Sequence, residues 1–191
     1  MSLTNPYGDV ELDDPRAMRA LAHPVRLSIL ELLHEHGTGT ATECAAEVGE
    51  SPQACSYHLR SLARWGLITK AASADGRETR WQLAARSITF AGGSDSPAAD
   101  AAAAALKATV LDRDRRLVDE FLAREHELSK EWRDAASFLT GSVYATAKEV
   151  EELSQRVLEL LKPYERPARA DRPEGARRVH FMFRAIPKVG E

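Results

Sequence analysis

Two helix-start signals that lie only eleven residues apart constrain this chain more than any other feature of its sequence. Thr40 is followed three residues later by Glu43, which is the capping-box spacing, and Gly49 provides a stop signal. Ser51 and Pro52 then supply a second N-cap and a proline at the first helical position. The first helix can therefore be only about two turns long, and the second starts after a tight turn. Two helices joined in this way form a helix-turn-helix.

A β-hairpin is predicted directly after the second helix of this pair. We place the two helices at about residues 41–48 and 52–65 and expect strands at both ends of residues 67–83. The polar stretch between those strands contains Asp75-Gly76, a strong hairpin-turn signal. Two helices and a hairpin in this order form a winged helix-turn-helix. In this fold the second helix enters the DNA major groove, and the hairpin, or wing, contacts the backbone or the minor groove.

Two further helices are predicted before the pair. Asp14-Pro15 has the pattern of an N-cap and a first helical residue, and His23-Pro24 interrupts that helix and starts another, which ends before Gly37. The second of these helices has a wide apolar face: Val25, Leu27, Ile29, Leu30, Leu32 and Leu33. We assign residues 13–91 to the winged helix-turn-helix domain. The preceding residues 1–12 are rich in turn formers, and we expect them to form a flexible lead.

The second half of the chain carries a different pattern, which begins after a linker-like run at residues 92–97. Alanine, the best helix former, dominates the start of one long helix predicted over about residues 98–132. Apolar residues repeat along it at helical spacing: Leu106, Val110, Leu117, Phe121, Leu122 and Leu128. A single copy would expose this stripe, so we expect a homodimer paired through the helix. Residues 98–191 are accordingly assigned to dimerisation and to a candidate effector-binding region.

The C-terminal part is predicted to add one more helix and a small β-layer. Thr146 and Glu149 form a second capping box, and the apolar residues that follow indicate a helix up to Leu161. Residues 178–186 are predicted to form a strand that Pro187 stops, and we expect a partner strand within residues 137–146. The fold class is thus mainly α (α+β). It combines a winged helix-turn-helix domain, a long dimerisation helix, and a C-terminal helix with a small β-layer.

The net charge of −3 at pH 7 argues at first against a nucleic-acid partner, but the charge is not uniform along the chain. Residues 1–50 hold three basic and nine acidic residues, a net charge of −6. Residues 51–86 hold six basic and two acidic residues, a net charge of +4, and residues 87–191 carry the remaining −1. The cationic segment therefore coincides with the second helix of the pair and the wing.

Composition indicates a cytoplasmic globular protein. Apolar residues make up 43% of the chain, which is too much for wholesale disorder. The two cysteines, Cys44 and Cys55, cannot form a disulfide framework, and we expect both to fill small gaps between packed helices. No apolar run of about 18 residues occurs, and the N-terminus lacks a signal-peptide core, so no membrane partner is expected.

Nine residues are candidates for contacting double-stranded DNA. Apolar residues at helical spacing define a buried face on the 52–65 helix, so the polar and basic residues opposite that face are exposed. No acidic residue occurs between Glu50 and Asp75. The N-terminus of the helix carries a partial positive charge that suits phosphate, and the side chains can contact bases or backbone. The nine candidates are Ser51, Gln53, Ser56, Tyr57, Arg60, Arg64, Lys70, Arg77 and Arg80.

Two stretches of the sequence resemble ArsR-type winged-helix transcription regulators. Residues 22–33, Ala-His-Pro-Val-Arg-Leu-Ser-Ile-Leu-Glu-Leu-Leu, resemble their opening helix. Residues 56–68, Ser-Tyr-His-Leu-Arg-Ser-Leu-Ala-Arg-Trp-Gly-Leu-Ile, resemble their recognition helix and the entry to the wing. The resemblance covers about residues 13–86 and implies a homodimer that most often acts as a repressor. It further implies that DNA is read by Gln53, Ser56, Tyr57 and Arg60, and that the wing carries Arg77 and Arg80.

The metal-sensing branch of that family is not expected here. Its thiol site needs two clustered thiolates, because soft metals prefer them, whereas Cys44-Ala45-Ala46 lacks the second thiol. The other common site needs acidic and histidine ligands on the dimerisation helix. The long helix offers Asp114, Asp119, Glu125 and His126, without a second histidine to complete the set. We therefore expect neither a metal ion nor a cofactor.

Rings elsewhere in the sequence have two interpretations. We expect Trp65 and Trp81 in the core beneath the wing, and His58 as a structural histidine bonded to a neighbouring helix. Four aromatic residues of the second half are candidates for an effector pocket, although such residues commonly close a hydrophobic core: Phe121, Trp132, Phe138 and Tyr144.

Three functions are compatible with the sequence, and the first is a homodimeric, sequence-specific DNA-binding transcription regulator. The second is a winged helix that binds protein, which should show an apolar or acidic face, whereas the face of residues 52–65 is cationic and polar. The third is a ligand-responsive sensor that binds a small molecule within residues 98–191. The sequence shows no nucleophile elbow, phosphate loop, zinc signature or supported pair of catalytic carboxylates, so we expect no enzyme.

Overall fold

The fold is described from a computed structural model of the chain, which divides into two compact units at Asp119 and Glu120. We call them the N-terminal unit (Met1–Asp119) and the C-terminal unit (Glu120–Glu191) and describe each by itself. The structure describes residues 10–12, 14–72, 78–85, 88–90, 96–164 and 173–190.

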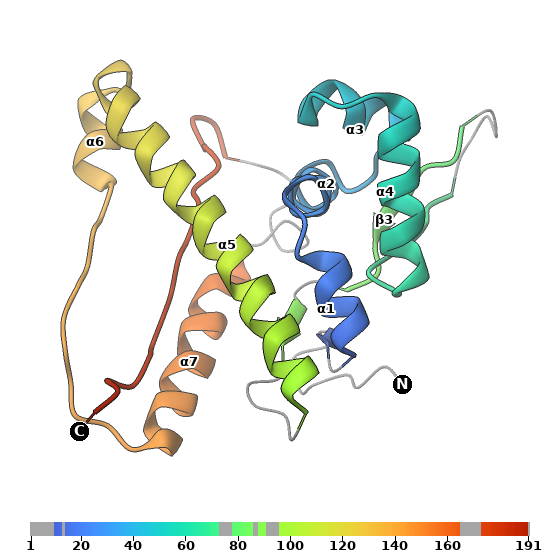
Figure 1. Ribbon diagram of the computed structural model, residues 1–191. Coiled ribbons are helices and arrows are strands. Elements are labelled where there is room, and N and C mark those ends of the chain that lie inside the picture. The colour runs from blue at the N-terminus through green and yellow to red at the C-terminus, as the bar shows by residue number, and fades with distance from the viewer. Residues whose placement is uncertain are drawn as a thin grey trace. The chain divides into compact units, whose positions relative to one another are not determined.

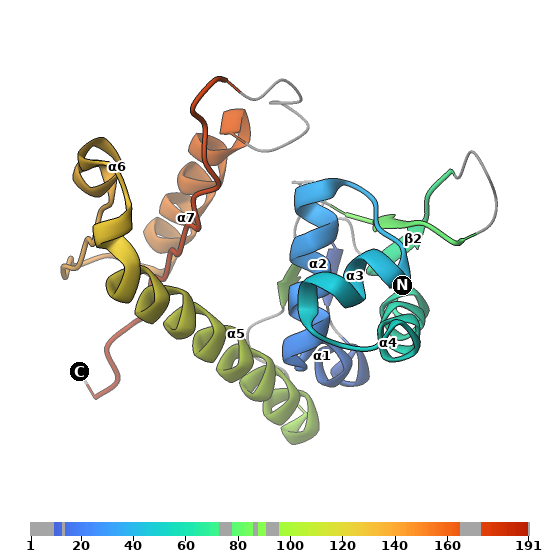
Figure 2. The same cartoon turned by 90° about the horizontal axis from the view of Figure 1, so that it is seen from above.

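Four helices form the first part of the N-terminal unit: α1 (Pro15–Leu21), α2 (Pro24–His36), α3 (Ala41–Val48) and α4 (Pro52–Arg64). Each predicted helix start is confirmed. The Asp14 carboxylate accepts from the backbone N–H of Arg16, and the Ser51 hydroxyl accepts from that of Ala54 at 3.1 Å. Thr40 and Glu43 form a capping box with both of its reciprocal bonds. Figures 1 and 2 show α3 and α4 as neighbours with the wing beside α4.

The wing is a short antiparallel hairpin of β2 (Ile68–Lys70) and β3 (Trp81–Leu83), as the sequence predicts. Ile68 pairs with Leu83 and Lys70 with Trp81. Gly39, in the loop between α2 and α3, exchanges two backbone hydrogen bonds with Trp81, of 2.9 and 2.8 Å. The wing is therefore joined to the helical core through its second strand. The predicted turn at Asp75-Gly76 lies outside the described residues.

A second pair of strands was not predicted. β1 (Val10–Leu12) pairs in parallel with β4 (Ile88–Phe90), and the Leu12 side chain lies in the hydrophobic core. Residues 10–12, which the sequence places in a flexible lead, are thus held by a partner strand. A strand of three residues is too short to show an alternating pattern, and its partner lies far away along the chain.

One hydrophobic core joins α1 to α4, the base of the wing and the start of α5 (Pro97–Arg124). Its fully buried large side chains are Leu21, Ile29, Leu33, Leu59, Leu62 and Leu106. On α5, Ala102 and Ala103 are buried beside Leu106, so the alanine-rich start of this helix packs against the domain. Small side chains at these positions let the helix backbone approach the core closely. The predicted core positions of Trp65 and Trp81 are confirmed, because both are partly buried against this cluster.

The long helix is shorter than the sequence predicts. It ends at Arg124, and a 3₁₀ turn η1 (Glu125–Glu127) and a separate helix α6 (Lys130–Ala135) follow. Leu128 is extended, and the Ser129 hydroxyl accepts from the backbone N–H of Trp132 at 3.4 Å as the N-cap of α6. A serine that caps a new helix competes with continuation of the old one, and the apolar periodicity does not record that competition.

The C-terminal unit contains α6, α7 (Ala147–Leu161) and a 3₁₀ turn η2 (Lys162–Tyr164). The capping box of Thr146 and Glu149 is present with both bonds. The predicted C-terminal β-layer is wrong for the described residues, since neither 137–146 nor 178–186 is a strand. A strand must bond to a neighbouring backbone, and the residue types of one segment do not supply that neighbour. No described residue of this unit is buried.

The predicted class of a mainly helical winged helix-turn-helix protein is confirmed by these elements and the small wing sheet. The two compact units meet within α5, between Asp119 and Glu120, whereas the sequence predicts a linker at residues 92–97. The predicted domain ranges stay predictions. None of the helices in the described residues has the length and apolar character that spanning a membrane requires.

Candidate nucleic-acid interface

Helix α4 has two chemically different faces. Cys55, Leu59 and Leu62 are at most 1% exposed and pack into the core. The opposite face presents Gln53 and Tyr57 to solvent, and the Tyr57 side chain is 62% exposed. The amide of Gln53 and the phenol of Tyr57 lie one helical turn apart and do not pack into the core. Their hydrogen-bonding groups therefore remain available to a partner. The predicted division of this helix into a buried core face and an exposed polar face is confirmed.

The N-terminal end of α4 is capped and exposed to solvent. Ser51 is exposed, and its hydroxyl oxygen accepts from the Ala54 N–H, so its proton remains able to donate to a partner. Pro52 at the first helical position has no N–H to satisfy. Ser56, one turn further, is half-buried. The helix end therefore offers polar groups and a partial positive charge at an exposed site.

Two arginines continue the exposed face of α4 toward its C-terminal end. Arg60 Nε donates to the Ser56 carbonyl oxygen at 3.1 Å, which holds the side chain along the helix surface. The Arg64 guanidinium lies 5.9 Å from the centre of the Trp65 ring. Arg16 of α1 lies 5.7 Å from the same ring, a neighbour that sequence spacing could not reveal because the two residues are 49 positions apart. Arg16 is also paired with Asp14, at 2.9 Å.

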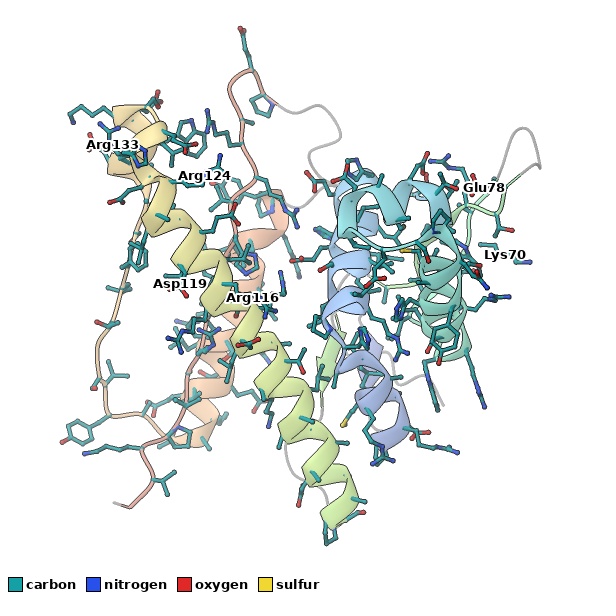
Figure 3. The ribbon with its side chains drawn as sticks, turned by 45° about the horizontal axis from the view of Figure 1, so that its top comes forward. Lys70, Glu78, Arg116, Asp119, Arg124 and Arg133 are labelled. Carbon is teal, nitrogen blue, oxygen red and sulfur yellow. The ribbon has the colours of Figure 1, made fainter. Side chains whose placement is uncertain are left out.

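On the wing, the predicted residues have different environments. Lys70 of β2 is exposed, and Figure 3 shows it on the wing together with Glu78. Arg80 is not a free cation. Its Nη1 and Nη2 donate to the two Glu43 carboxylate oxygens at 3.1 and 3.0 Å, and its Nε donates to Thr38 Oγ1 at 3.2 Å. Arg77 lies outside the described residues.

Glu43 was predicted only as a helix-capping residue, and the structure gives it a second role. Its Oε2 accepts both the backbone N–H of Thr40, at 2.8 Å, and the Arg80 guanidinium. The Thr40 N–H, with further help from Arg80, lowers the pKa of the Glu43 carboxyl below its ordinary value despite partial desolvation. Arg80 lies 37 positions away along the chain, so no local pattern could have identified the pair.

On the buried side of α4, His58 is a structural histidine, as predicted. Arg26 Nε on α2 approaches His58 Nδ1 at 3.3 Å, and the His23 and His58 ring centres are 4.7 Å apart. Burial lowers the pKa of both imidazoles, and the neighbouring positive charge of Arg26 lowers them further, whereas Glu50 opposes the effect. Two neutral rings therefore pack together on the buried side of α4 near neutral pH.

The two cysteines are buried and free, which confirms their predicted role as fillers of the core. Burial raises the pKa of the Cys44 thiol to about 11 and also raises that of Cys55. Thiols with raised pKa values remain protonated near neutral pH and are poor nucleophiles.

The structure brings together only some of the four aromatic residues predicted to line an effector pocket. Within the C-terminal unit, the Phe121 and Phe138 ring centres are 5.9 Å apart. Trp132 lies beneath a different group, the Arg177 guanidinium, at 5.8 Å. The Tyr144 side chain is fully exposed. Of the four predicted residues, Phe121 and Phe138 thus form a ring pair, and the exposed Tyr144 side chain is not part of it.

Comparison with known proteins agrees with the architecture of the N-terminal unit. Residues 21–71 match the family model described as a helix-turn-helix domain. This segment includes α2, α3, α4 and β2, and therefore the whole exposed face of α4 described above. The chain contains a helix-turn-helix domain. The match supports a DNA-binding transcriptional regulator, and the predicted ArsR subtype is a finer assignment that it does not reach.

No curated protein matches the chain. Among solved structures, the YusO protein from Bacillus subtilis is 15% identical over 77% of this chain and 80% of that chain, with a TM-score of 0.34. The adhesin competence repressor AdcR from Streptococcus pyogenes is 18% identical over 74% and 81%, with a TM-score of 0.34. The MarR family protein Rv2887 of Mycobacterium tuberculosis, in complex with salicylic acid, is 21% identical over 76% and 85%, with a TM-score of 0.31.

Proposed function

We propose that this protein is a sequence-specific DNA-binding repressor of the ArsR type that acts as a homodimer. One observation carries the proposal: α4 buries one face in the core and exposes an opposite face that holds amide, phenol and guanidinium groups and no carboxylate. Phosphate and base edges are recognised by such groups, whereas a carboxylate on this face would repel the DNA backbone. The proposal assigns the protein no catalytic activity.

In this proposal each protomer places α4 in the major groove. Gln53, Ser56 and Tyr57 lie in the first turns of the helix, where base edges come within reach. Arg60 and Arg64 continue along the same helix toward phosphates or a guanine, and Lys70 contacts the backbone from the wing. A homodimer then reads two half-sites about one helical turn, or roughly 34 Å, apart.

Homodimerisation is supported by the apolar surface that one copy leaves exposed. On α5, the Leu111 side chain is 48% exposed and the Leu122 side chain is 53% exposed. Although Leu106 of this 28-residue helix is buried in the core of its own chain, the two exposed leucines give the helix an apolar surface suitable for pairing. Sedimentation-velocity measurements should give twice the chain mass of 21.0 kDa, and a monomer at micromolar concentration would refute this part of the proposal.

Titration with labelled duplex DNA of mixed sequence at about 50 mM salt is the first test, because non-specific binding is strongest at low salt. Binding should weaken steeply as salt rises. Sequences selected from a random pool should then bind far more tightly than the mixture. Arg60→Ala should lower the affinity for a selected site by about 1–3 kcal/mol if Arg60 makes a bidentate base contact.

The same titration separates this function from that of a winged-helix module that binds protein. A module of that kind would give no binding to DNA at about 50 mM salt. The favoured result is binding that depends on Arg60, since the exposed face of α4 is polar and cationic rather than apolar.

A second candidate function, ligand-dependent control of DNA binding, is favoured by the ring pair of Phe121 and Phe138. The two rings offer an exposed apolar surface to which an apolar small molecule can bind, and a ligand bound there would favour one dimer geometry over another if it bound that geometry more tightly. Thermal-shift screening of apolar metabolites, with DNA release as the second readout, tests this function. Phe138→Ala should abolish any shift, and a dimer that responds to no ligand class would argue against the sensor.

A further inference from the structure

The wing is too small to hold its own position. Each of its strands is three residues long, and an isolated two-stranded hairpin is marginally stable in water. The base of the hairpin is anchored in the core, because Leu67 and Ile68 are each 2% exposed. Beyond that base, the position of the wing depends on the contacts that its second strand, and the residues leading into that strand, make with the helices.

Side chains of α3 bond to the residues that lead into that second strand. Residues Glu78 and Arg80 lie two positions apart in the segment that leads into β3, and both side chains bond to α3. Thr42 Oγ1 donates to Glu78 Oε1 at 2.7 Å, and Arg80 donates to both carboxylate oxygens of Glu43. Thr42 and Glu43 are consecutive residues of the first turn of α3. The first turn of α3 is thereby hydrogen-bonded directly to the wing.

The contact between Arg80 and Glu43 is geometrically demanding. A planar guanidinium that donates two parallel bonds to one carboxylate fixes both distance and orientation, which a lysine ammonium cannot do. The third bond, from Arg80 Nε to Thr38 Oγ1, reaches the loop before α3. One residue later in that loop, Gly39 bonds to the backbone of Trp81. Arg80 therefore links the wing both to α3 and to the loop before α3.

We propose that Glu43 and Arg80 are positioning residues of the DNA interface, which set the location of the wing relative to α4. This inference rests on the proposed DNA-binding function. In it, Arg80 acts on DNA affinity through the wing and not through an ionic contact with phosphate. Glu43, an acidic residue, then supports DNA binding, which is the opposite of what charge alone predicts for a residue near the interface.

Affinity measured as a function of salt separates positioning from a direct phosphate contact. Arg80→Ala, Arg80→Lys and Glu43→Gln should each weaken binding by about tenfold, with the slope of log affinity against log salt unchanged. The double variant Arg80→Ala/Glu43→Gln should bind no worse than either single variant. Lys70→Ala is the matched control for a wing cation that contacts phosphate, and it should reduce the slope by about 0.9.

A direct phosphate contact by Arg80 gives a different set of results and would overturn the proposal. Arg80→Lys would then keep most of the affinity because the charge remains, Arg80→Ala would reduce the slope by about 0.9, and Glu43→Gln would bind as the wild type does. Glu43→Gln keeps an oxygen that can accept the Thr40 N–H, so the helix cap survives. Circular dichroism and thermal unfolding of each variant confirm that the fold is retained.

Amide hydrogen exchange without DNA makes failure of this inference distinguishable from failure of the proposed function. Arg80→Lys and Glu43→Gln should speed exchange at Gly39 and Trp81, whose backbone bonds lie beside the pair, and leave Leu59 on α4 unchanged. Unchanged exchange at Gly39 and Trp81 would show that the pair does not hold the wing. If the wild-type protein bound no DNA at about 50 mM salt, the proposed function would fail and the role of the pair in DNA binding would fail with it.

Discussion

The two faces of α4 predict opposite consequences for two substitutions that lie only two residues apart. Leu59 is completely buried, and Leu59→Ala removes three carbon atoms from the core. Transfer of those atoms costs about 2.4 kcal/mol at about 0.8 kcal/mol each, and the cavity left behind raises the expected loss to about 3–4 kcal/mol. Tyr57 is 62% exposed, so Tyr57→Ala should change the free energy of unfolding by less than about 0.5 kcal/mol.

For DNA affinity, the exposed position Tyr57 should be the sensitive one. Tyr57→Ala should weaken binding to a selected DNA site by about tenfold, although the fold is intact. Urea denaturation followed by circular dichroism, at one fixed protein concentration because a dimer is expected, gives the free energies of unfolding. Fluorescence anisotropy gives the affinities. Equal destabilisation by the two substitutions, or unchanged affinity of Tyr57→Ala, would refute the assignment of faces.

Three further predictions follow from particular residues. The pKa values of His23 and His58 are lowered in the folded protein, so the unfolded chain binds more protons than the folded one just below pH 6.5. The free energy of unfolding should therefore be highest above pH 6.5 and should fall as the pH decreases toward the pKa values of the folded protein. Replacing His58 with glutamine should flatten that part of a curve of stability against pH. Gly49 has φ +72° and open space where a Cβ atom would lie, so Gly49→Ala should cost about 1 kcal/mol from backbone strain alone, measured by denaturation; no loss would contradict the left-handed conformation. Cys44, buried and with a thiol pKa of about 11, should resist iodoacetamide at pH 8 in the folded protein and react after denaturation, which mass spectrometry can follow; rapid modification of the native protein would show that the thiol is accessible.

Features that depend on neighbouring residues were predictable from the sequence. Both capping boxes, Thr40 with Glu43 and Thr146 with Glu149, form because three residues of spacing bring each pair together in any helix. The two faces of α4 follow equally from local periodicity, since the helix has only one apolar stripe to bury.

Features that depend on tertiary neighbours were not predictable in this way. The charge of Arg80 indicated a DNA contact, whereas the bidentate pair with Glu43 exists only because the folded chain brings the residues before β3 beside the first turn of α3. The continuous apolar repeat through Leu128 likewise gave no sign of the break after Arg124, because a serine cap at Ser129 overrides periodicity.

The predicted strand at 178–186 failed for a related reason. A segment rich in aromatic and branched apolar residues favours an extended chain, and its composition says nothing about which backbone lies alongside. In the described part of the C-terminal unit, this segment is not paired as a strand.

The central claim is that the exposed face of α4 reads DNA sequence. Its most direct test is the ratio of affinities for the best selected duplex and for mixed-sequence DNA, measured by anisotropy at about 150 mM salt. The account predicts a ratio of at least about a thousandfold, reduced at least tenfold by Arg60→Ala. A ratio near one, or the same ratio after Arg60→Ala, would contradict it.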